Sequence, residues 1–171
     1  MSSAATLVET DAAADSRRAK PGKYLTFSLA AEEYGVPVLK VREIMKIMPI
    51  TAVPQVPPHV KGVINLRGKV ITVVDLRLKF GLEAQEPTDQ TAIVVVEIGG
   101  DGRKLLTGII VDFVSDVLNI VADEIEQTPA FGDRVVTDYL SGMAKVKGRV
   151  KILLDLDMAL GWDGRTRASE A

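Results

Sequence analysis

Residues 60–82 read VKGVINLRGKVITVVDLRLKFGL, and residues 140–162 read LSGMAKVKGRVKILLDLDMALGW. The two stretches align without a gap at an offset of 80 residues (142 − 62 = 80). Glycines, an aspartate and apolar residues stay in step: Gly62, Gly68, Val70, Asp75, Leu76 and Gly81 match Gly142, Gly148, Val150, Asp155, Leu156 and Gly161. Solenoids repeat every ~20–50 residues, whereas one long period that occurs twice indicates two small domains about a pseudo-twofold axis.

A weaker echo lies outside these stretches. Residues 35–45 (GVPVLKVREIM) parallel residues 108–118 (GIIVDFVSDVL) at an offset of 73 (108 − 35 = 73). Together the echoes predict two similar halves with a groove between them. We expect a disordered tail at 1–22, a first barrel-like subdomain at 23–82, a polar linker at 83–90, a second subdomain at 91–162 and a tail at 163–171.

The composition excludes several classes of function. The 171 residues are 47% hydrophobic, enough for a core, and 21 Lys and Arg against 23 Asp and Glu give a net charge of −2, which calls for no polyanionic partner. Without cysteine there is no disulfide, thiolate nucleophile or cysteine metal site. The N-terminal stretch lacks the apolar centre of a signal peptide, and we expect a cytoplasmic protein without membrane insertion.

The first half is predicted to open with a strand and a helix. Residues 23–29 (KYLTFSL) alternate as a half-buried strand does, and Glu32-Glu33 predicts a turn. Further on, the apolar residues fall at the helical spacing i, i+3, i+4, i+7: Val41, Ile44, Met45 and Met48. This spacing predicts a short amphipathic helix from Val38, which Pro49 ends.

The repeated stretches predict β-hairpins. Runs at 60–66 and 70–76 flank Arg67-Gly68-Lys69, where glycine supplies the positive φ of a tight turn, and the pattern recurs at 143–146 and 150–154. Asp75 and Asp155 then follow as N-caps of short helices that end at glycine. Further β-branched runs at 91–98 and 103–112 bring each half to about five strands, which predicts a mainly β fold of two small antiparallel barrels.

Catalytic groups are scarce. Asp75 and Asp155 sit at matching positions, as two aspartates of an aspartic protease would, but Leu76-Arg77 and Leu156-Asp157 follow them instead of a hydroxyl residue and glycine. We therefore favour the capping role. His59 is the sole histidine, and neither G-x-S-x-G nor a phosphate-binding glycine motif occurs. The sequence argues against an enzyme and predicts no cofactor.

Two loop residues are candidates for partner binding. Arg67 lies in a rigid turn and is a suitable bidentate anchor for a partner's carboxylate, the alternative being an idle solvated arginine. Phe131, in TPAFGD, either anchors an interface or plugs a barrel end. A different hypothesis is a nucleic-acid-binding twin barrel, which the basic residues of the hairpins favour: Lys61, Arg67, Lys69, Lys145, Lys147, Arg149 and Lys151. Only 5% aromatic residues leave few platforms for stacking bases.

Three segments carry a resemblance to a known family. EEYGVPVLKVREI at 32–44, HVKGVINLRGKVITVVDLRLKFG at 59–81 and GIIVDFVSDVLNI at 108–120 resemble, in order and spacing, the CheW family of bacterial chemotaxis coupling proteins. The resemblance runs from about residue 23 to 160 and implies two five-stranded SH3-like barrels. It also implies a non-enzymatic scaffold that couples methyl-accepting chemoreceptors to the histidine kinase CheA, recruited to membrane-associated receptor arrays.

The resemblance further implies which residues contact each partner. The cytoplasmic tip of a receptor is expected to dock between the barrels, at the positions that match the family's receptor-binding surface: Val41, Glu43, Gly62, Arg67 and Gly68. The helical spacing places Val41 toward the core, where it would shape the groove. The kinase is expected to bind through its C-terminal regulatory domain, barrel against barrel, at Ala92, Ile93, Glu126 and Phe131.

Overall fold

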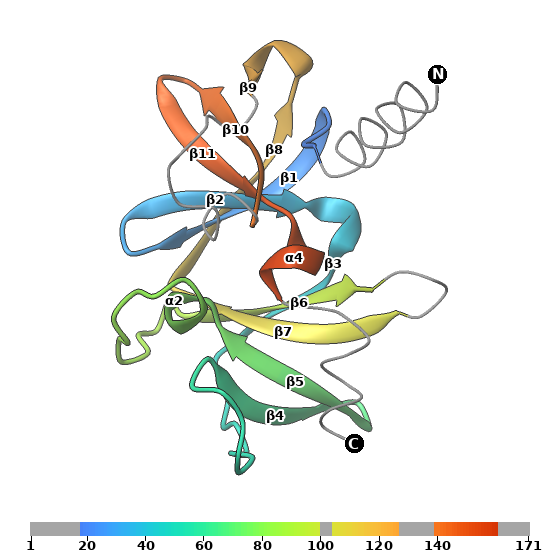
Figure 1. Ribbon diagram of the computed structural model, residues 1–171, viewed down its shortest axis with the longest axis vertical. Helices are drawn as coiled ribbons and strands as arrows, with labels where there is room; N and C mark the ends of the chain where they lie inside the picture. The colour runs from blue at the N-terminus through green and yellow to red at the C-terminus, as the bar shows by residue number, and fades with distance from the viewer. Residues whose placement is uncertain (1–17, 100–103, 127–138, 161–171) are drawn as a thin grey trace, which may run out of the picture.

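The computed structural model describes residues 18–99, 104–126 and 139–160, and its strands form two sheets (Figure 1). The upper sheet has the order β8-β1-β2-β11-β10-β9 and the lower sheet the order β3-β6-β7-β5-β4. The upper strands are β1 (Gly22–Leu29), β2 (Glu32–Pro37), β8 (Phe113–Ile120), β9 (Ile125–Glu126), β10 (Leu140–Val146) and β11 (Arg149–Leu154). The lower strands are β3 (Val41–Lys46), β4 (Val60–Leu66), β5 (Lys69–Asp75), β6 (Ala92–Ile98) and β7 (Leu105–Val111).

Each sheet closes on itself, because the chain runs on from one edge strand and pairs with the strand at the other edge. After β3, Thr51 forms an antiparallel bridge with Val63 of β4. After β8, the 3-10 helix η2 (Ala122–Glu124) leads into β9, where Glu126 pairs with Met143 of β10. The two sheets are thus small barrels, the upper barrel and the lower barrel, and the predicted mainly β fold is confirmed.

The barrels do not follow the division of the sequence. The lower barrel joins β3, β4 and β5 of the first half to the hairpin β6–β7 of the second, while the upper barrel joins β1–β2 to β8 through β11. Parallel pairings hold the exchanged hairpins, β2 on β11 and β7 on β5. Each half therefore gives its first hairpin to the other half's barrel. Residues 83–90, expected to separate subdomains, connect two elements of the lower barrel.

The registers reproduce both echoes of the sequence. Gly62 lies opposite Val73 at a bulge in β4, and Gly142 lies opposite Leu153 at a bulge in β10. The residues of the weaker echo also occupy equivalent positions in the two sheets, because Gly35 pairs with Leu153 and Gly108 with Val73. The two barrels are therefore equivalent strand by strand.

The helix predicted from Val38 is wrong. Val38–Lys40 form a single 3-10 turn, η1, and Val41–Lys46 is the edge strand β3, antiparallel to β6. Along β3 exposure alternates, with Ile44 46% exposed and Met45 packed against the lower core. Pairing with β6 decides the conformation, since tertiary context overrides a weak local pattern.

The start of the described chain also differs from expectation. The turn lies at Ala30-Ala31, with φ of 50° and 71°, and Glu32 already belongs to β2. Within the expected tail, the Ala19 amide donates to the Ser141 carbonyl (2.8 Å) and the Tyr24 hydroxyl to the Lys20 carbonyl (2.7 Å), so these residues are ordered. The rest of that tail, 1–17, and the tail at 163–171 lie outside the described residues.

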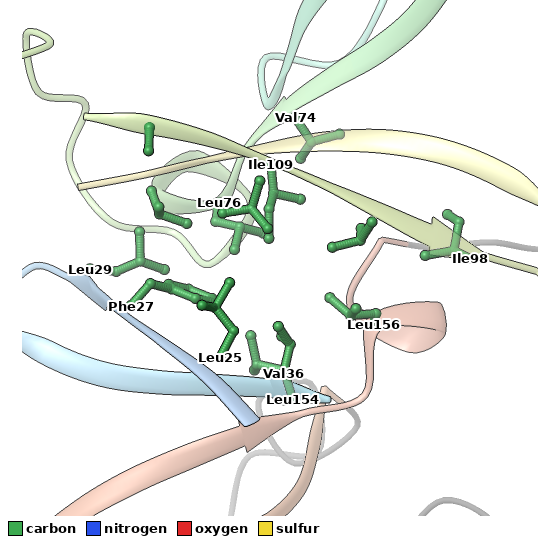
Figure 2. Close-up of a cluster of buried hydrophobic side chains, with 14 residues drawn as sticks. Leu25, Phe27, Leu29, Val36, Val74, Leu76, Ile98, Ile109, Leu154 and Leu156 are labelled. Carbon is green, nitrogen blue, oxygen red and sulfur yellow. The ribbon is translucent and has the colours of Figure 1, made fainter. Parts of the chain in front are cut away.

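Within the described ranges, apolar side chains gather in three cores. The largest lies between the barrels and draws on both (Figure 2): its members include Leu25, Phe27, Leu29, Val36, Val74, Leu76, Val94, Val96, Ile98, Ile109, Leu154 and Leu156. Each barrel adds an interior core of its own, centred on Ile71, Val73 and Ile93 in the lower barrel and on Tyr24, Ile120 and Leu153 in the upper. Strand β6 is buried on both faces, which explains its unbroken apolar run.

The hairpin turns of the repeat and the aspartate N-caps are confirmed, whereas Gly161, predicted to end the second helix, lies outside the described residues. Gly68 and Gly148 have φ of 86° and 79°, as their hairpins require. The Arg77 amide donates to the Asp75 carboxylate (2.9 Å) at the start of α2 (Leu76–Lys79), and the Met158 amide to Asp155 (3.2 Å) at the start of α4 (Leu156–Ala159).

The Asp112 carboxylate joins the two barrels. Asp112, between β7 and β8, accepts from the Ala30 amide of the upper barrel (2.9 Å) and from Arg77 of the lower barrel at Nε (2.8 Å) and Nη2 (2.6 Å). Burial raises the pKa of Asp112, but these hydrogen bonds and the Arg77 charge outweigh burial and hold the pKa below its usual 3.8. The ionised carboxylate thus stabilises the junction between the barrels.

Candidate partner-binding surface

Arg67 and Glu43 meet where the lower barrel closes. Arg67 Nη2 donates to Glu43 Oε1 at 3.0 Å, which joins the β4–β5 turn to the edge strand β3. The turn is fixed by Gly68, whose amide donates to the Asn65 side chain (2.9 Å). The Arg67 side chain nevertheless stays 77% exposed, so its remaining guanidinium donors face solvent.

This ion pair was not predicted, because 24 residues separate its members and residues 38–48 were expected to be helical. Arg67 has no acidic residue close to it along the chain, and the barrel supplies Glu43 from another strand. A guanidinium held by one carboxylate and open on its other side can still bind a second carboxylate.

Val41 and Gly62 lie in the strands β3 and β4, which carry Glu43 and lead to Arg67. Val41, the first residue of β3, is half-buried and packs against the core between the barrels. Gly62 has φ of +143°, and a Cβ built there would stand 2.0 Å from the Thr51 carbonyl oxygen. Only glycine therefore lets the segment after β3 close on β4.

A cleft of about 890 Å³ opens on the upper barrel, where residues 18–24, η1 and α4 meet. Leu39 stands 85% exposed and Met158 36% exposed at this cleft, and Lys20, Lys23 and Lys40 also line it. Figure 1 shows α4 between the two sheets. Asp155 and Asp157 line the cleft too, but with Arg18 and the three lysines the cations outnumber the carboxylates, which suits a partner segment with an apolar face and acidic flanks.

The residues predicted for kinase contact are distributed differently. Ala92 and Ile93 lie in β6, a central strand between β3 and β7, and are 8% and 0% exposed. Glu126, at the end of β9, is exposed and forms an ion pair with Lys145 of β10 (3.6 Å). Phe131 lies outside the described residues. The structure does not bring Ala92 and Ile93 to the surface beside Glu126.

The basic residues of the hairpins are partly neutralised. Lys145 pairs with Glu126, and Lys151, 8% exposed at its side chain, pairs with Glu33 of β2. The described part of the chain contains no cluster of three or more possible metal ligands, and none of its helices is long and apolar enough to cross a membrane. Each repeated aspartate caps its own helix.

Residues 23–163 match the family model of the CheW-like domain. The chain belongs to the CheW-like family. It is similar to chemotaxis protein CheW of Klebsiella aerogenes, with 37% identity over 138 residues that cover 81% of each chain. Chemotaxis protein CheW of Bacillus subtilis is 33% identical over 138 residues, which cover 81% of this chain and 86% of that protein.

A solved CheW structure agrees with this two-barrel architecture. The crystal structure of scaffolding protein TtCheW from Thermoanaerobacter tengcongensis matches with a TM-score of 0.74 and 36% identity, over 84% of this chain and 95% of that one. As a member of this family, the chain is a non-enzymatic scaffold of chemotaxis. The role of the CheW family is to couple chemoreceptors to CheA. The comparisons do not favour nucleic-acid binding.

Proposed function

We propose that this chain binds the cytoplasmic tip of a methyl-accepting chemoreceptor at the Arg67–Glu43 edge and holds the regulatory domain of CheA at a separate surface. The observation that carries the receptor assignment is the half-satisfied guanidinium of Arg67, fixed on a left-handed turn with φ of 52°. A rigid donor loses little side-chain freedom on binding, which favours affinity for a carboxylate.

The cleft beside η1 offers apolar contacts to the same class of partner. Leu39 and Met158 line it and can pack against the apolar face of a helix, and Leu39 lies four residues before Glu43 along the chain (43 − 39 = 4). A helical hairpin with apolar and acidic positions on one face fits this combination. Val41, Gly62 and Gly68 act through the backbone geometry and the core that place the edge.

For the kinase we propose direct contact at Glu126 and Phe131. Ala92 and Ile93 are buried, so their contribution is to fix β6 and its neighbours rather than to touch the partner. Binding of both partners would recruit the chain from the cytoplasm to receptor arrays at the membrane.

The receptor assignment is tested by titrating the wild-type chain and Arg67→Glu against a receptor hairpin fragment and, separately, against a CheA regulatory domain. Reversing the charge should weaken receptor binding about tenfold or more, since a charge-assisted hydrogen bond becomes a repulsion, and should leave kinase affinity unchanged. Lys69→Glu, in the same turn, controls for loss of positive charge in general. Unchanged receptor affinity of a folded Arg67→Glu variant would overturn the assignment.

A further inference from the structure

The edge strands of the two barrels are equivalent residue by residue. In β3 a bulge at Arg42 separates Val41, opposite Val96, from Glu43, opposite Val95. In β8 a bulge at Ser115 separates Val114, opposite Phe27, from Asp116, opposite Thr26. Val114 and Asp116 therefore occupy in the upper barrel the positions of Val41 and Glu43 in the lower.

The hairpin turns are equivalent as well. Lys147 and Gly148 have φ of 53° and 79°, against 52° and 86° at Arg67 and Gly68. Gly142 lies at the same bulge as Gly62. The residue that follows the turn glycine by two positions is an exposed valine in both barrels, Val70 at 72% and Val150 at 46%.

The upper barrel carries side chains of the same chemical classes at the positions equivalent to the lower-barrel receptor set. The five positions Val41, Glu43, Gly62, Arg67 and Gly68 become Val114, Asp116, Gly142, Lys147 and Gly148. One acid replaces another and one cation another, on the same backbone. A patch of purely structural importance would need the glycines and the valine, but not a surface acid and a surface cation at matching places.

The upper set differs in its ion pairing. Among the described residues Lys147 forms no ion pair, whereas Arg67 is held by Glu43. The Asp116 carboxylate instead accepts from the neighbouring Val117 amide (2.8 Å). Lys147 can therefore take a partner's carboxylate without giving up an internal one, but with a single ammonium instead of a bidentate fork. Binding there should be the weaker of the two.

We propose that Val114, Asp116, Gly142, Lys147 and Gly148 form a second binding surface for the class of partner assigned to the lower barrel, an α-helical segment that presents carboxylates. This inference rests on the proposed assignment of the receptor to the Arg67–Glu43 edge. Lys147 is the one cation of this five-residue set, together with an acid and a valine, which suits an acidic protein helix and not a phosphate backbone. One chain would thus hold two receptor hairpins, on sites related by the pseudo-twofold axis.

The test is the number of receptor hairpin fragments bound per full-length chain, from calorimetric titration and native mass spectrometry. The wild type should bind two, with different affinities. Lys147→Glu should bind one, with the tighter phase kept and the weaker phase reduced about tenfold or more. Arg67→Glu should also bind one, with the weaker phase kept. Lys147→Arg should keep or strengthen the weaker binding phase. Arg149→Glu, two residues along the hairpin, should retain that phase.

The outcomes separate this inference from the assignment on which it rests. A wild-type ratio of one, lost in Arg67→Glu and unaffected in Lys147→Glu, would overturn the second surface and leave the first. If neither substitution changes the affinity for the receptor fragment, both proposed receptor surfaces are overturned. If Lys147→Glu weakens binding of the CheA regulatory domain instead, the surface is a kinase contact and the inference is wrong.

Discussion

At the scale of single residues, backbone conformation positions the candidate site. Gly68 was predictable, because a tight hairpin between two apolar runs requires a positive φ. The partner of Arg67 was not, because Glu43 arrives from a strand that the local spacing had presented as a helix. The residues that form a tight turn are adjacent in the sequence, so the turn can be predicted from them. The Arg67–Glu43 ion pair forms only once the barrel closes and brings β3 beside the β4–β5 turn.

Two equivalent glycines provide a matched test of this geometry. Gly62→Ala should destabilise the fold by about 2–4 kcal/mol, since the residue has φ of +143° and the new Cβ would stand 2.0 Å from the Thr51 carbonyl oxygen. Gly142→Ala should cost about 1 kcal/mol or less, because its nearest contacts are 3.1 Å and 3.3 Å away, at the Ala19 Cβ and the Glu126 carbonyl oxygen. Urea unfolding measures both, and equal losses would show that closure at Thr51 is not the constraint.

At the scale of elements, the strands on the strong repeat were predictable and β3 was not. The hairpins β4–β5 and β10–β11 carry their turn glycines and apolar runs in the sequence, and so do the caps of α2 and α4. Residues 38–48 show a helical spacing by coincidence. The echo of residues 35–45 in the β-branched stretch 108–118 was the signal that could have corrected it, because both stretches form the same two-strand unit.

The buried ion pair of the upper barrel has apolar counterparts in the lower barrel. Lys151 and Glu33, neighbours on β11 and β2, correspond to Ile71 and Leu106 (151 − 80 = 71; 33 + 73 = 106). Lys151→Ile alone should cost about 1–3 kcal/mol, because Glu33, whose side chain is only 21% exposed, would lose its counter-charge and keep the Ser115 hydroxyl as a donor. The double variant Lys151→Ile, Glu33→Leu should be as stable as the wild type or more so.

Thermal and urea unfolding of the two single variants and the double variant measure this coupling. A double variant no more stable than Lys151→Ile would mean that the loss comes from packing around residue 151 and not from the unpaired carboxylate.

At the scale of the whole molecule, duplication could be read from the sequence but the exchange of hairpins could not. Sequence offsets record which segments are alike, and they are the same whether each half folds on itself or gives its first hairpin to the other barrel. The exchange is decided by packing: Leu25, Phe27 and Leu29 of β1 share one core with Val94, Val96 and Ile98 of β6. The core between the barrels thus makes the two barrels one folding unit.

The junction between the barrels should be sensitive to acid. The pKa of Asp112 is lowered in the folded state, so its contribution to stability is complete above the ordinary pKa of 3.8 and is lost as pH falls through the lower, folded value. Asp112→Ala should lose about 1–3 kcal/mol at pH 7 and lose less further stability than the wild type between about pH 5 and the acid transition. Asp123→Ala, in the exposed helix η2, is the control. Parallel pH profiles for the wild type and Asp112→Ala would contradict this role.

The central claim is that one chain carries a receptor and a kinase at the same time, on different surfaces. Sedimentation velocity of the full chain mixed with a receptor hairpin fragment and a CheA regulatory domain tests it most directly. The wild type should form a single species that contains all three components, and Arg67→Glu should form only the complex with the kinase domain. If the two partners displace each other from the wild-type chain, they share one surface, and the chain cannot bridge receptor and kinase as proposed.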